Sequence, residues 1–265
     1  MYMNNIFVEG IQGSGKSSLV QELTKELREL HVYREGDYSP IELAWCTWMN
    51  EKEYQQVLNR YEVLKEEIIK NTVKEAEHFI VTYTRILTEI SGFHKDLEQY
   101  EIYNGRKSAE EVQKIVCSRY EKFTESGCLF ECSFFQNIVE DLILFHQLND
   151  DEIVEFYREL YSKIDKDNFL MLYLQSDNIT QNIEIIRKER CDDAGNEMWY
   201  PLMLGYLTTS PYGKTHGYQD FHDMITHFEH RQQLELRIIK EVIKERAIII
   251  PAKNYKIGDL VAHIK

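Results

Sequence analysis

The sequence predicts an α/β protein with a doubly wound, parallel, five-stranded sheet. Five short apolar runs are distributed along the chain, and most of them are rich in β-branched or aromatic residues. Their apolarity is nearly continuous rather than alternating, which is typical of strands covered on both faces of a parallel sheet. Long segments with a helical period separate the runs, and this alternation indicates crossover connections. The expected strands are residues 6–9, 31–34, 128–131, 169–174 and 247–250.

The segments between the strands carry apolar stripes at helical spacing. The first stripe follows the first strand and runs from Leu19 to Leu30. Another begins after Ser108 and Glu111, whose spacing predicts a capping box at the start of a helix. Two further stripes predict helices near residues 138–145 and 153–160.

Two stretches do not fit a bare alternation of strands and helices. Residues 51 to about 77 are rich in Glu and Lys and predict one long polar helix beside the substrate cleft. Residues 192–217 contain several Gly and Pro residues among aromatic side chains, and we interpret them as an irregular, mobile flap. Because no change in composition requires a second domain, we expect a single domain over residues 1–265, with a helical insertion at about 51–126 and a lid or flap at about 187–217.

The balance of charges narrows the class of ligand. The chain has 31 basic and 45 acidic residues and a formal charge of −14, so its surface repels phosphate backbones and anionic lipid. We therefore expect neither a nucleic-acid polymer nor a membrane as partner, although one small anion can still bind in a local basic pocket.

Five cysteines without C-x-x-C spacing indicate reduced thiols, and no apolar run approaches the roughly 20 residues that span a bilayer. We expect a cytoplasmic protein, and a homodimer is left open.

A phosphate-binding loop, or P-loop (the Walker A motif), is predicted at residues 10–17, which match G-x-x-x-x-G-K-[ST] at every fixed position. An expected strand precedes the run and an amphipathic helix follows it. Glycines let consecutive backbone N–H groups turn toward anionic oxygens, and the helix N-terminus adds the positive end of its dipole. Lys16 supplies a charge for the β- and γ-phosphates, and Ser17 supplies a hydroxyl for Mg²⁺. The residues expected to bind ATP are Gly10, Gln12, Gly13, Ser14, Gly15, Lys16, Ser17 and Ser18.

Other motifs decide among the classes of P-loop protein. The chain has no Asn-Lys-x-Asp run, which reads guanine in switch GTPases, and no long apolar strand that ends in Asp-Glu, as ATPases of the AAA type carry. Glu131 closes the third expected strand. Since doubly wound folds bind ligands at the carboxyl ends of their strands, we predict that Glu131 and Ser17 hold Mg²⁺ directly or through water.

In several blocks the chain resembles the thymidylate kinases and the deoxynucleoside kinases. Residues 7–18 are similar to the opening of those enzymes, and Tyr-Arg-Glu-Gly at 33–36 lies where they have an Arg-Glu-Pro or Pro-Glu-Pro run. Residues 130–136 lie where they have an acidic-Arg pair followed by a helix. Residues 172–174, followed by a helix that ends in Arg-Lys-Glu-Arg at 187–190, resemble their fourth strand and arginine-rich lid. The resemblance implies a nucleotide-kinase-like P-loop fold that uses ATP and Mg²⁺.

The resemblance also implies roles for residues outside the loop. Glu35 matches the carboxylate that accepts a proton from the attacking hydroxyl in deoxynucleoside kinases, and Asp37 is a rival for that role. Arg187 and Arg190 would act on the transferring phosphoryl group as part of a lid. Together with Lys16, these residues form the expected catalytic set.

One departure from the family pattern concerns the acceptor side. Cys132 stands where those enzymes have an arginine that contacts phosphates, and Arg85, Arg119 and Arg231 are candidates to replace it. Our leading hypothesis is an enzyme, a kinase that moves the γ-phosphoryl group of ATP to a hydroxyl or phosphate of a small molecule, with a nucleoside or nucleotide as the expected acceptor. The alternatives are a non-nucleoside acceptor, such as an antibiotic, sugar or metabolite, and a regulatory nucleotide-binding protein with little turnover.

Overall fold

The chain folds into two compact units. Unit 1 consists of the residues up to Val32 and from Thr124 onward, and unit 2 is Tyr33–Phe123. The computed structural model describes residues 4–264. We expected one domain with a helical insertion at about 51–126, and unit 2 includes most of that stretch but begins earlier, at Tyr33. The insertion is therefore part of a larger unit.

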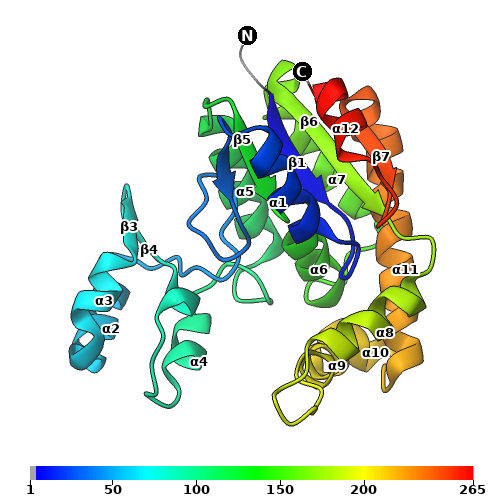
Figure 1. Cartoon of the computed structure of the whole chain (residues 1–265). Helices are drawn as coiled ribbons and strands as arrows, with labels where there is room; N and C mark the ends of the chain where they lie inside the picture. The colour runs from blue at the N-terminus through cyan, green and yellow to red at the C-terminus, as the bar shows by residue number, and fades with distance from the viewer. Residues whose placement is uncertain (1–3, 265) are drawn as a thin grey trace. The chain divides into compact units, whose positions relative to one another are not determined.

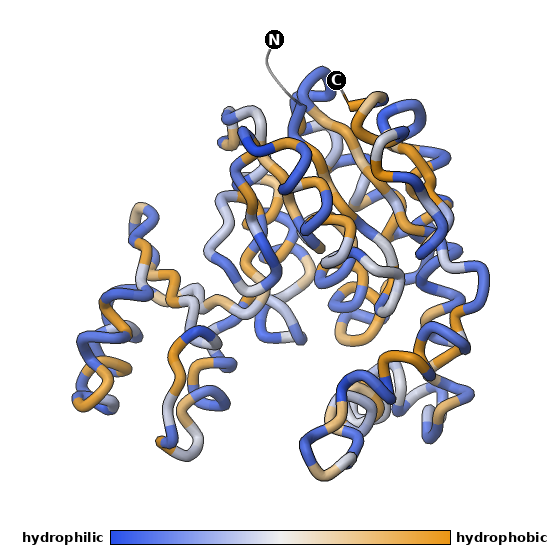
Figure 2. The backbone as a smooth tube through the Cα atoms, in the orientation of Figure 1, coloured by the Kyte–Doolittle hydropathy of each residue, from blue (hydrophilic) through white to orange (hydrophobic). Residues whose placement is uncertain are grey.

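A five-stranded sheet forms the centre of unit 1, in the order β2–β5–β1–β6–β7 (Figure 1). The ladders between β1 and β5, between β1 and β6, and between β6 and β7 are parallel. Figure 2 shows that the strands other than β2 are largely apolar along their length. The five strands agree with the predicted ranges to within one residue at each end, and they are β1 (Asn5–Glu9), β2 (His31–Tyr33), β5 (Cys128–Glu131), β6 (Phe169–Gln175) and β7 (Ala247–Pro251).

Aliphatic side chains fill the space between one face of the sheet and two helices. These helices are α1 (Lys16–Glu26) and α12 (Ile257–Ile264). Side chains of both helices belong to the same buried cluster as Ile6 and Val8 of β1. Because successive side chains of a strand point to opposite faces, Phe7 between them faces the other side of the sheet.

Aromatic rings fill the space over that second face. Phe7 stacks on Phe130 and Phe169, with ring centroids 5.0 and 4.5 Å apart. The helix α7 (Asp150–Ser162) contributes Tyr161, whose ring packs against Phe169 with the centroids 5.5 Å apart. Since helices cover both faces of the sheet, the prediction of a doubly wound α/β fold is confirmed.

The segment after β6 is helical, whereas we expected an irregular flap at residues 192–217. That expectation is wrong from Trp199 onward, because the two Pro residues lie where a helix tolerates them. Pro201 lies in the first turn of its helix and Pro211 is the first residue of the next, where a helix makes no use of the missing N–H. The helices are α8 (Ile179–Glu189), α9 (Trp199–Thr209), α10 (Pro211–His216) and α11 (Phe221–Ile238).

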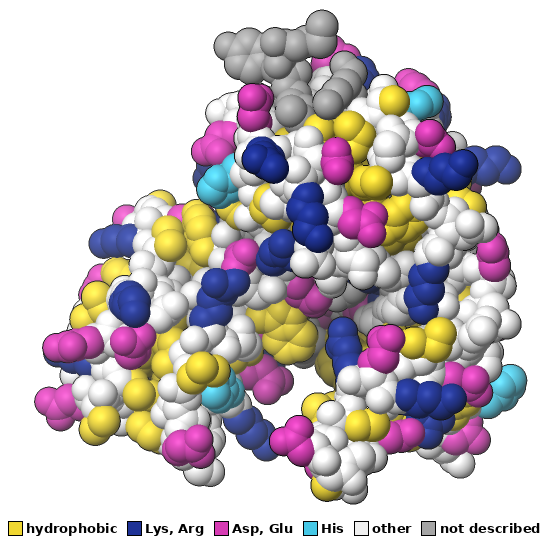
Figure 3. All heavy atoms as spheres, in the orientation of Figure 1, with side chains coloured by type: hydrophobic (Ala, Val, Ile, Leu, Met, Phe, Trp, Pro, Cys, Tyr) yellow, Lys and Arg dark blue, Asp and Glu magenta, His cyan; other side chains and the backbone are white. Residues whose placement is uncertain are grey.

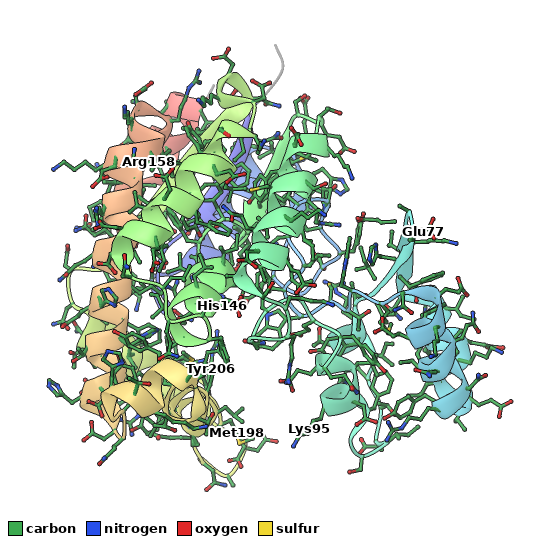
Figure 4. The ribbon with its side chains drawn as sticks, turned by 180° about the vertical axis from the view of Figure 1, so that it is seen from behind. Glu77, Lys95, His146, Arg158, Met198 and Tyr206 are labelled. Atoms are coloured by element: carbon green, nitrogen blue, oxygen red, sulfur yellow. The ribbon has the colours of Figure 1, made fainter. Side chains whose placement is uncertain are left out.

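The helix α9 docks on another helix of unit 1. Tyr206 of α9 lies close to His146 in Figure 4, and its ring centroid is 5.5 Å from that of Phe145. Phe145 directly follows α6 (Gln136–Leu144). The aromatic contact therefore joins α9 to the end of α6, although Leu202 of α9 stays 72% exposed.

Unit 2 contains an antiparallel hairpin that the sequence did not lead us to expect. Residues 51 to about 77 were predicted as one polar helix, but the first helix ends at Arg60 and the chain enters a strand at Thr72. The β-branched and aromatic residues at 72–81 favour strands, and Ala76 turns the chain between them with a φ of 48°. The elements of unit 2 are α2 (Glu51–Arg60), α3 (Lys65–Lys70), β3 (Thr72–Glu75), β4 (His78–Val81), α4 (Phe93–Glu98) and α5 (Ala109–Lys122).

Capping boxes begin two helices of unit 2. The predicted box of Ser108 and Glu111 is confirmed at the start of α5. Asn50 and Glu53 form a second box at the start of α2. The unit has a core of its own, which includes Met49, Tyr54, Leu58, Ile68, Phe79, Val81, Phe93 and Leu97.

The surface carries charges of both signs. On the face seen in Figure 3, acidic and basic side chains are interspersed over each unit. All five cysteines have free thiols. Within residues 4–264, no helix is long and apolar enough to cross a lipid bilayer.

Candidate phosphate-binding site

The predicted phosphate loop, residues 10–17, leaves the carboxyl end of β1 and leads into α1. The strand order reverses at β1, since β2 and β5 lie on one side of it and β6 and β7 on the other. Doubly wound folds bind their ligands at such a point, beyond the carboxyl ends of the strands. The loop therefore occupies the position at which this fold presents a ligand site.

Two glycines let the loop pass close to neighbouring segments. Gly10 has a φ of 143°, and a Cβ atom there would lie 2.6 Å from the carbonyl oxygen of Leu174. Gly13 has a φ of 78°, and a Cβ atom there would lie 2.6 Å from Cδ1 of Ile186. Both backbone angles are costly for residues with a side chain. The loop is therefore held tightly between the ends of β6 and α8.

Lys16 and Ser14 have the chemistry that a phosphate group requires. The ammonium group of Lys16 is buried and donates to the carbonyl oxygens of Gly10 at 2.7 Å and Ile11 at 3.0 Å. The hydroxyl of Ser14 is buried without a hydrogen-bond partner among the described residues. A buried polar atom without a partner is costly, and a phosphate oxygen would supply one. Gly15 and Ser18 complete the loop and the first turn of α1.

Ser17 and Glu131 meet on the face of the sheet that α1 covers. Glu131 ends β5 in register with Val8 of β1, which belongs to the cluster beneath α1. Ser17 lies in the first turn of α1, and its hydroxyl donates a 2.5 Å hydrogen bond to Oε1 of Glu131. The two residues that we predicted as Mg²⁺ ligands are thus brought together by the register of the strands.

This pair fits the requirements of Mg²⁺. Hard cations prefer carboxylate and hydroxyl oxygens, and Mg²⁺ usually takes few protein ligands together with phosphate oxygens and water. Among residues 4–264, no three His, Cys, Asp or Glu side chains gather as a separate metal site. Ser17 and Glu131 are therefore the residues that would hold Mg²⁺ beside the loop.

Glu9 is a buried carboxyl group beside the loop that sequence reasoning missed. It is the last residue of β1 and points to the face opposite Glu131, where Oε1 accepts a 2.6 Å hydrogen bond from the N–H of Phe134. Burial raises the pKa of Glu9 to about 7, and its Oε2 has no partner among the described residues. A charged residue that ends an apolar strand just before Gly10 was the available signal.

The two candidate bases, Glu35 and Asp37, lie in unit 2 and have different surroundings. Oδ2 of Asp37 accepts a 2.9 Å hydrogen bond from the N–H of Arg34, and Oδ1 forms an ion pair with Arg85. Asp37 therefore stabilises its own turn. Glu35 is exposed and accepts a 3.1 Å hydrogen bond from the indole N–H of Trp45.

The three arginines proposed as substitutes at Cys132 fall into different units. Arg85 and Arg119 belong to unit 2, where Arg85 pairs with Asp37 and Arg119 pairs with Glu75. Arg231 belongs to unit 1 and is completely buried, with Nη1 2.7 Å from Oε1 of Gln12 in the phosphate loop. Within unit 1, Arg231 is therefore in contact with the loop.

Arg187, one of the two predicted lid arginines, is engaged within unit 1. Its Nε and Nη2 donate to the two oxygens of Glu197 at 3.0 and 3.1 Å. Its guanidinium lies over the rings of Tyr200 and Phe221, 4.1 and 5.1 Å from their centroids. Arg190, at the end of α8, is exposed. Arg187 thus connects α8 to the starts of α9 and α11.

The sheet, the loop and the pair of Ser17 and Glu131 define an α/β protein of the P-loop type. No protein-family model matches the chain, and no curated protein matches it. Among solved structures the chain is similar to a deoxyadenosine kinase from M. mycoides with bound dATP, at 13% identity and a TM-score of 0.38, over 98% of this chain and 97% of that chain. A likeness at that level identifies no activity for this chain.

Proposed function

We propose that the chain is an ATP-dependent phosphotransferase that moves the γ-phosphoryl group of ATP to a hydroxyl or phosphate group of a small molecule. A nucleoside or nucleotide is the acceptor that we place first. The observation that carries this proposal is the loop itself, in which a buried Lys16 stands beside the hydrogen-bonded pair of Ser17 and Glu131.

Phosphoryl transfer needs alignment and neutralisation of charge more than covalent chemistry. In this proposal Lys16 and the N–H groups of the loop bind the phosphates, and Ser17 and Glu131 would hold Mg²⁺. When bound, Mg²⁺ would offset the negative charge of the phosphate oxygens. These residues account for the nucleotide side of the reaction.

For the acceptor side we favour Glu35 over Asp37 as the residue that orients the attacking hydroxyl. Both oxygens of Asp37 have protein partners, whereas Glu35 is exposed. A base must reach the proton that it accepts, so exposure favours Glu35. Arg190, with its exposed side chain, is the more suitable of the two lid arginines to act on the phosphoryl group, since Arg187 is engaged by Glu197.

An acceptor screen with the whole chain tests the proposal. The chain is incubated with ATP and Mg²⁺ and a panel of deoxynucleosides, nucleoside monophosphates, sugars and aminoglycosides, and products are identified by mass spectrometry. We expect a phosphorylated nucleoside or nucleotide. Lys16→Met should abolish transfer, whereas Lys25→Met, an exposed lysine on the same helix, should not.

The other outcomes of the screen are equally informative. Transfer only to a sugar or an antibiotic would replace the nucleoside with a different acceptor class. Tight binding of ATP with no transfer to any acceptor would favour a regulatory nucleotide-binding protein. Full activity of Lys16→Met would contradict the assignment of the loop.

A further inference from the structure

A buried cluster of charges lies directly beneath the phosphate loop. Its centre is Arg231 of α11, whose side chain is 0% exposed. Nε donates to Oε1 of Glu235, one turn along the same helix, at 2.7 Å. Nη1 donates to Oε1 of Glu140 on α6 at 2.6 Å. Nη1 also donates to Oε1 of Gln12 in the loop at 2.7 Å, so one side chain joins three segments.

The two carboxylates are themselves fixed by further partners. Oε2 of Glu140 lies 2.7 Å from Nε2 of His227, and Oε2 of Glu235 accepts a 2.7 Å hydrogen bond from the hydroxyl of Tyr173. Burial by itself would raise the pKa of Glu140, but His227 and Arg231 bring it down to about 2. Glu140 and Arg231 are therefore charged at neutral pH. The hydrogen bonds to Glu235, Glu140 and Gln12 leave the guanidinium little freedom to move.

Stability alone does not explain such a cluster. Buried ion pairs lose so much hydration that apolar side chains of the same volume often stabilise a fold as well or better. One guanidinium nitrogen, Nη2 of Arg231, even lacks a hydrogen-bond partner within the described part of the chain. A buried charge that stability does not explain indicates a functional role for Arg231. Because its guanidinium contacts Gln12, we infer that this role concerns the phosphate loop.

The contact with Arg231 determines how the amide of Gln12 is oriented. An arginine has only donors, so the carbonyl oxygen of Gln12 must face it and the NH₂ group must point away. No residue among 4–264 accepts a hydrogen bond from that NH₂ group, and the side chain of Gln12 is partly exposed. The loop thus presents an oriented, neutral donor between Gly10 and Gly13.

We propose that Gln12 donates a hydrogen bond from its side-chain NH₂ group to a phosphate oxygen of the bound nucleotide, and that Arg231 is the positioning residue that holds it in this orientation. This inference rests on the proposed function, since it needs a nucleotide in the loop. Arg231 acts through Gln12 and does not touch the nucleotide itself. Arg231 would orient Gln12 in the way that residues around a metal site orient the side chains that bind the metal.

Binding of a non-hydrolysable ATP analogue with Mg²⁺, measured by calorimetry, tests this assignment without requiring an acceptor. Gln12→Met keeps the volume but removes the donor, and we expect its Kd to rise about tenfold or more. Arg231→Lys keeps the charge but loses the planar fork, and we expect a similar rise. In the double variant, Arg231→Lys should add no further loss, because the donor that it positions is already absent.

The control is Arg237→Lys, the same substitution on the same helix. Arg237 also pairs with two carboxylates, Glu241 and Asp151, but does not contact the loop. We expect it to bind the analogue like the unmodified chain. If Arg231→Lys weakened binding by the same factor in the unmodified chain and in Gln12→Met, Arg231 would only stabilise the fold and the inference would be wrong.

One further variant keeps the test decisive. Gln12→Glu still offers an oxygen to Arg231 but turns the donor into a negatively charged acceptor, so we expect weaker binding than in Gln12→Met at an unchanged Tm. The measurement on Gln12→Glu needs no change at Arg231, so it remains valid if Arg231→Lys fails to fold. Wild-type binding by both Gln12 variants would overturn this inference alone, whereas no binding by the unmodified chain would overturn the proposed function.

Discussion

The hydroxyl of Ser17 and the carboxylate of Glu131 are joined by a hydrogen bond of 2.5 Å, although 114 positions separate them in the sequence. The pair arises because the register of β1 and β5 turns Glu131 toward α1, and because Ser17 lies in the first turn of that helix. Nucleotide binding at the loop would therefore depend on the end of a strand that lies far away in the sequence.

The variant Glu131→Gln should weaken the use of Mg²⁺ but keep the fold. The amide oxygen can still accept from Ser17, but the negative charge is lost, so the Mg²⁺ concentration for half-maximal nucleotide binding should rise about tenfold. A Mg²⁺ titration at fixed nucleotide concentration measures this shift. Glu26→Gln, an exposed change at the end of α1, is the control, and an unchanged Mg²⁺ requirement in Glu131→Gln would exclude Glu131 as a ligand.

Replacing the two candidate bases should separate catalysis from structure. Glu35→Gln is expected to lower kcat by about a hundredfold or more, with the Kd for ATP and the Tm unchanged. Asp37→Asn removes an ion pair with Arg85 and should cost about 1 kcal/mol of stability or less, with a smaller effect on kcat. Steady-state kinetics with the acceptor found in the screen decides between them, and the opposite pattern would make Asp37 the base.

Gly10→Ala should destabilise the chain more than the same change at an open position. At Gly10 the new Cβ would lie 2.6 Å from the backbone oxygen of Leu174, in addition to the strain of a φ of 143°. Gly195 also has a positive φ, 83°, but nothing lies within 4 Å of its Cβ position. We expect about 2 kcal/mol more loss for Gly10→Ala in denaturant unfolding, and equal losses would mean that the loop can move away from β6.

Glu9 should make the folded state less stable as the pH rises from about 4.5 to about 7. Its pKa is raised from 4.5 to about 7 by burial, so in this window the folded chain holds a proton that the unfolded chain has released. Stability from this group is present below the unfolded pKa and is lost as the pH rises through the folded pKa.

The variant Glu9→Gln tests this effect, because it keeps an oxygen for the N–H of Phe134 and cannot ionise. Relative to the unmodified chain, it should gain stability with rising pH, by about 3 kcal/mol in total at pH 7 and above. Denaturant unfolding at several pH values measures the difference. A difference that does not change with pH would show that Glu9 is not held in its neutral form.

The arginines at the end of α8 should differ in their effect on stability. Arg187→Lys keeps the charge but loses the paired hydrogen bonds to Glu197 and the stacking on Tyr200, so we expect a loss of about 1 kcal/mol. Arg190→Gln should change stability by less than about 0.5 kcal/mol and should lower kcat without changing the Kd for ATP. Thermal unfolding and kinetics together test this, and a Tm loss in Arg190→Gln would indicate a structural role there as well.

Local patterns in the sequence were sufficient to predict the strands and the position of the loop. Short apolar runs rich in β-branched and aromatic residues favour strands, and the five strands agree with the prediction to within one residue at each end. The loop motif was equally local, because all of its fixed positions lie within eight consecutive residues, 10–17, at the end of β1 and the start of α1. Composition gave wrong predictions in two places. The hairpin at residues 72–81 follows a polar helical segment and was partly included in the predicted helix. The helices after Trp199 contain Gly and Pro and were predicted as an irregular flap.

The sequence by itself therefore determined the fold class and the place of the predicted phosphate loop between β1 and α1. It also suggested which carboxylate ends a strand near that loop, but it did not choose among the three candidate arginines. Only the tertiary structure joined Arg231 to Gln12 across 219 positions and buried Glu9 against the N–H of Phe134. The physical reason is that burial and hydrogen bonding depend on which distant segments pack together, and no local period of the chain carries that information.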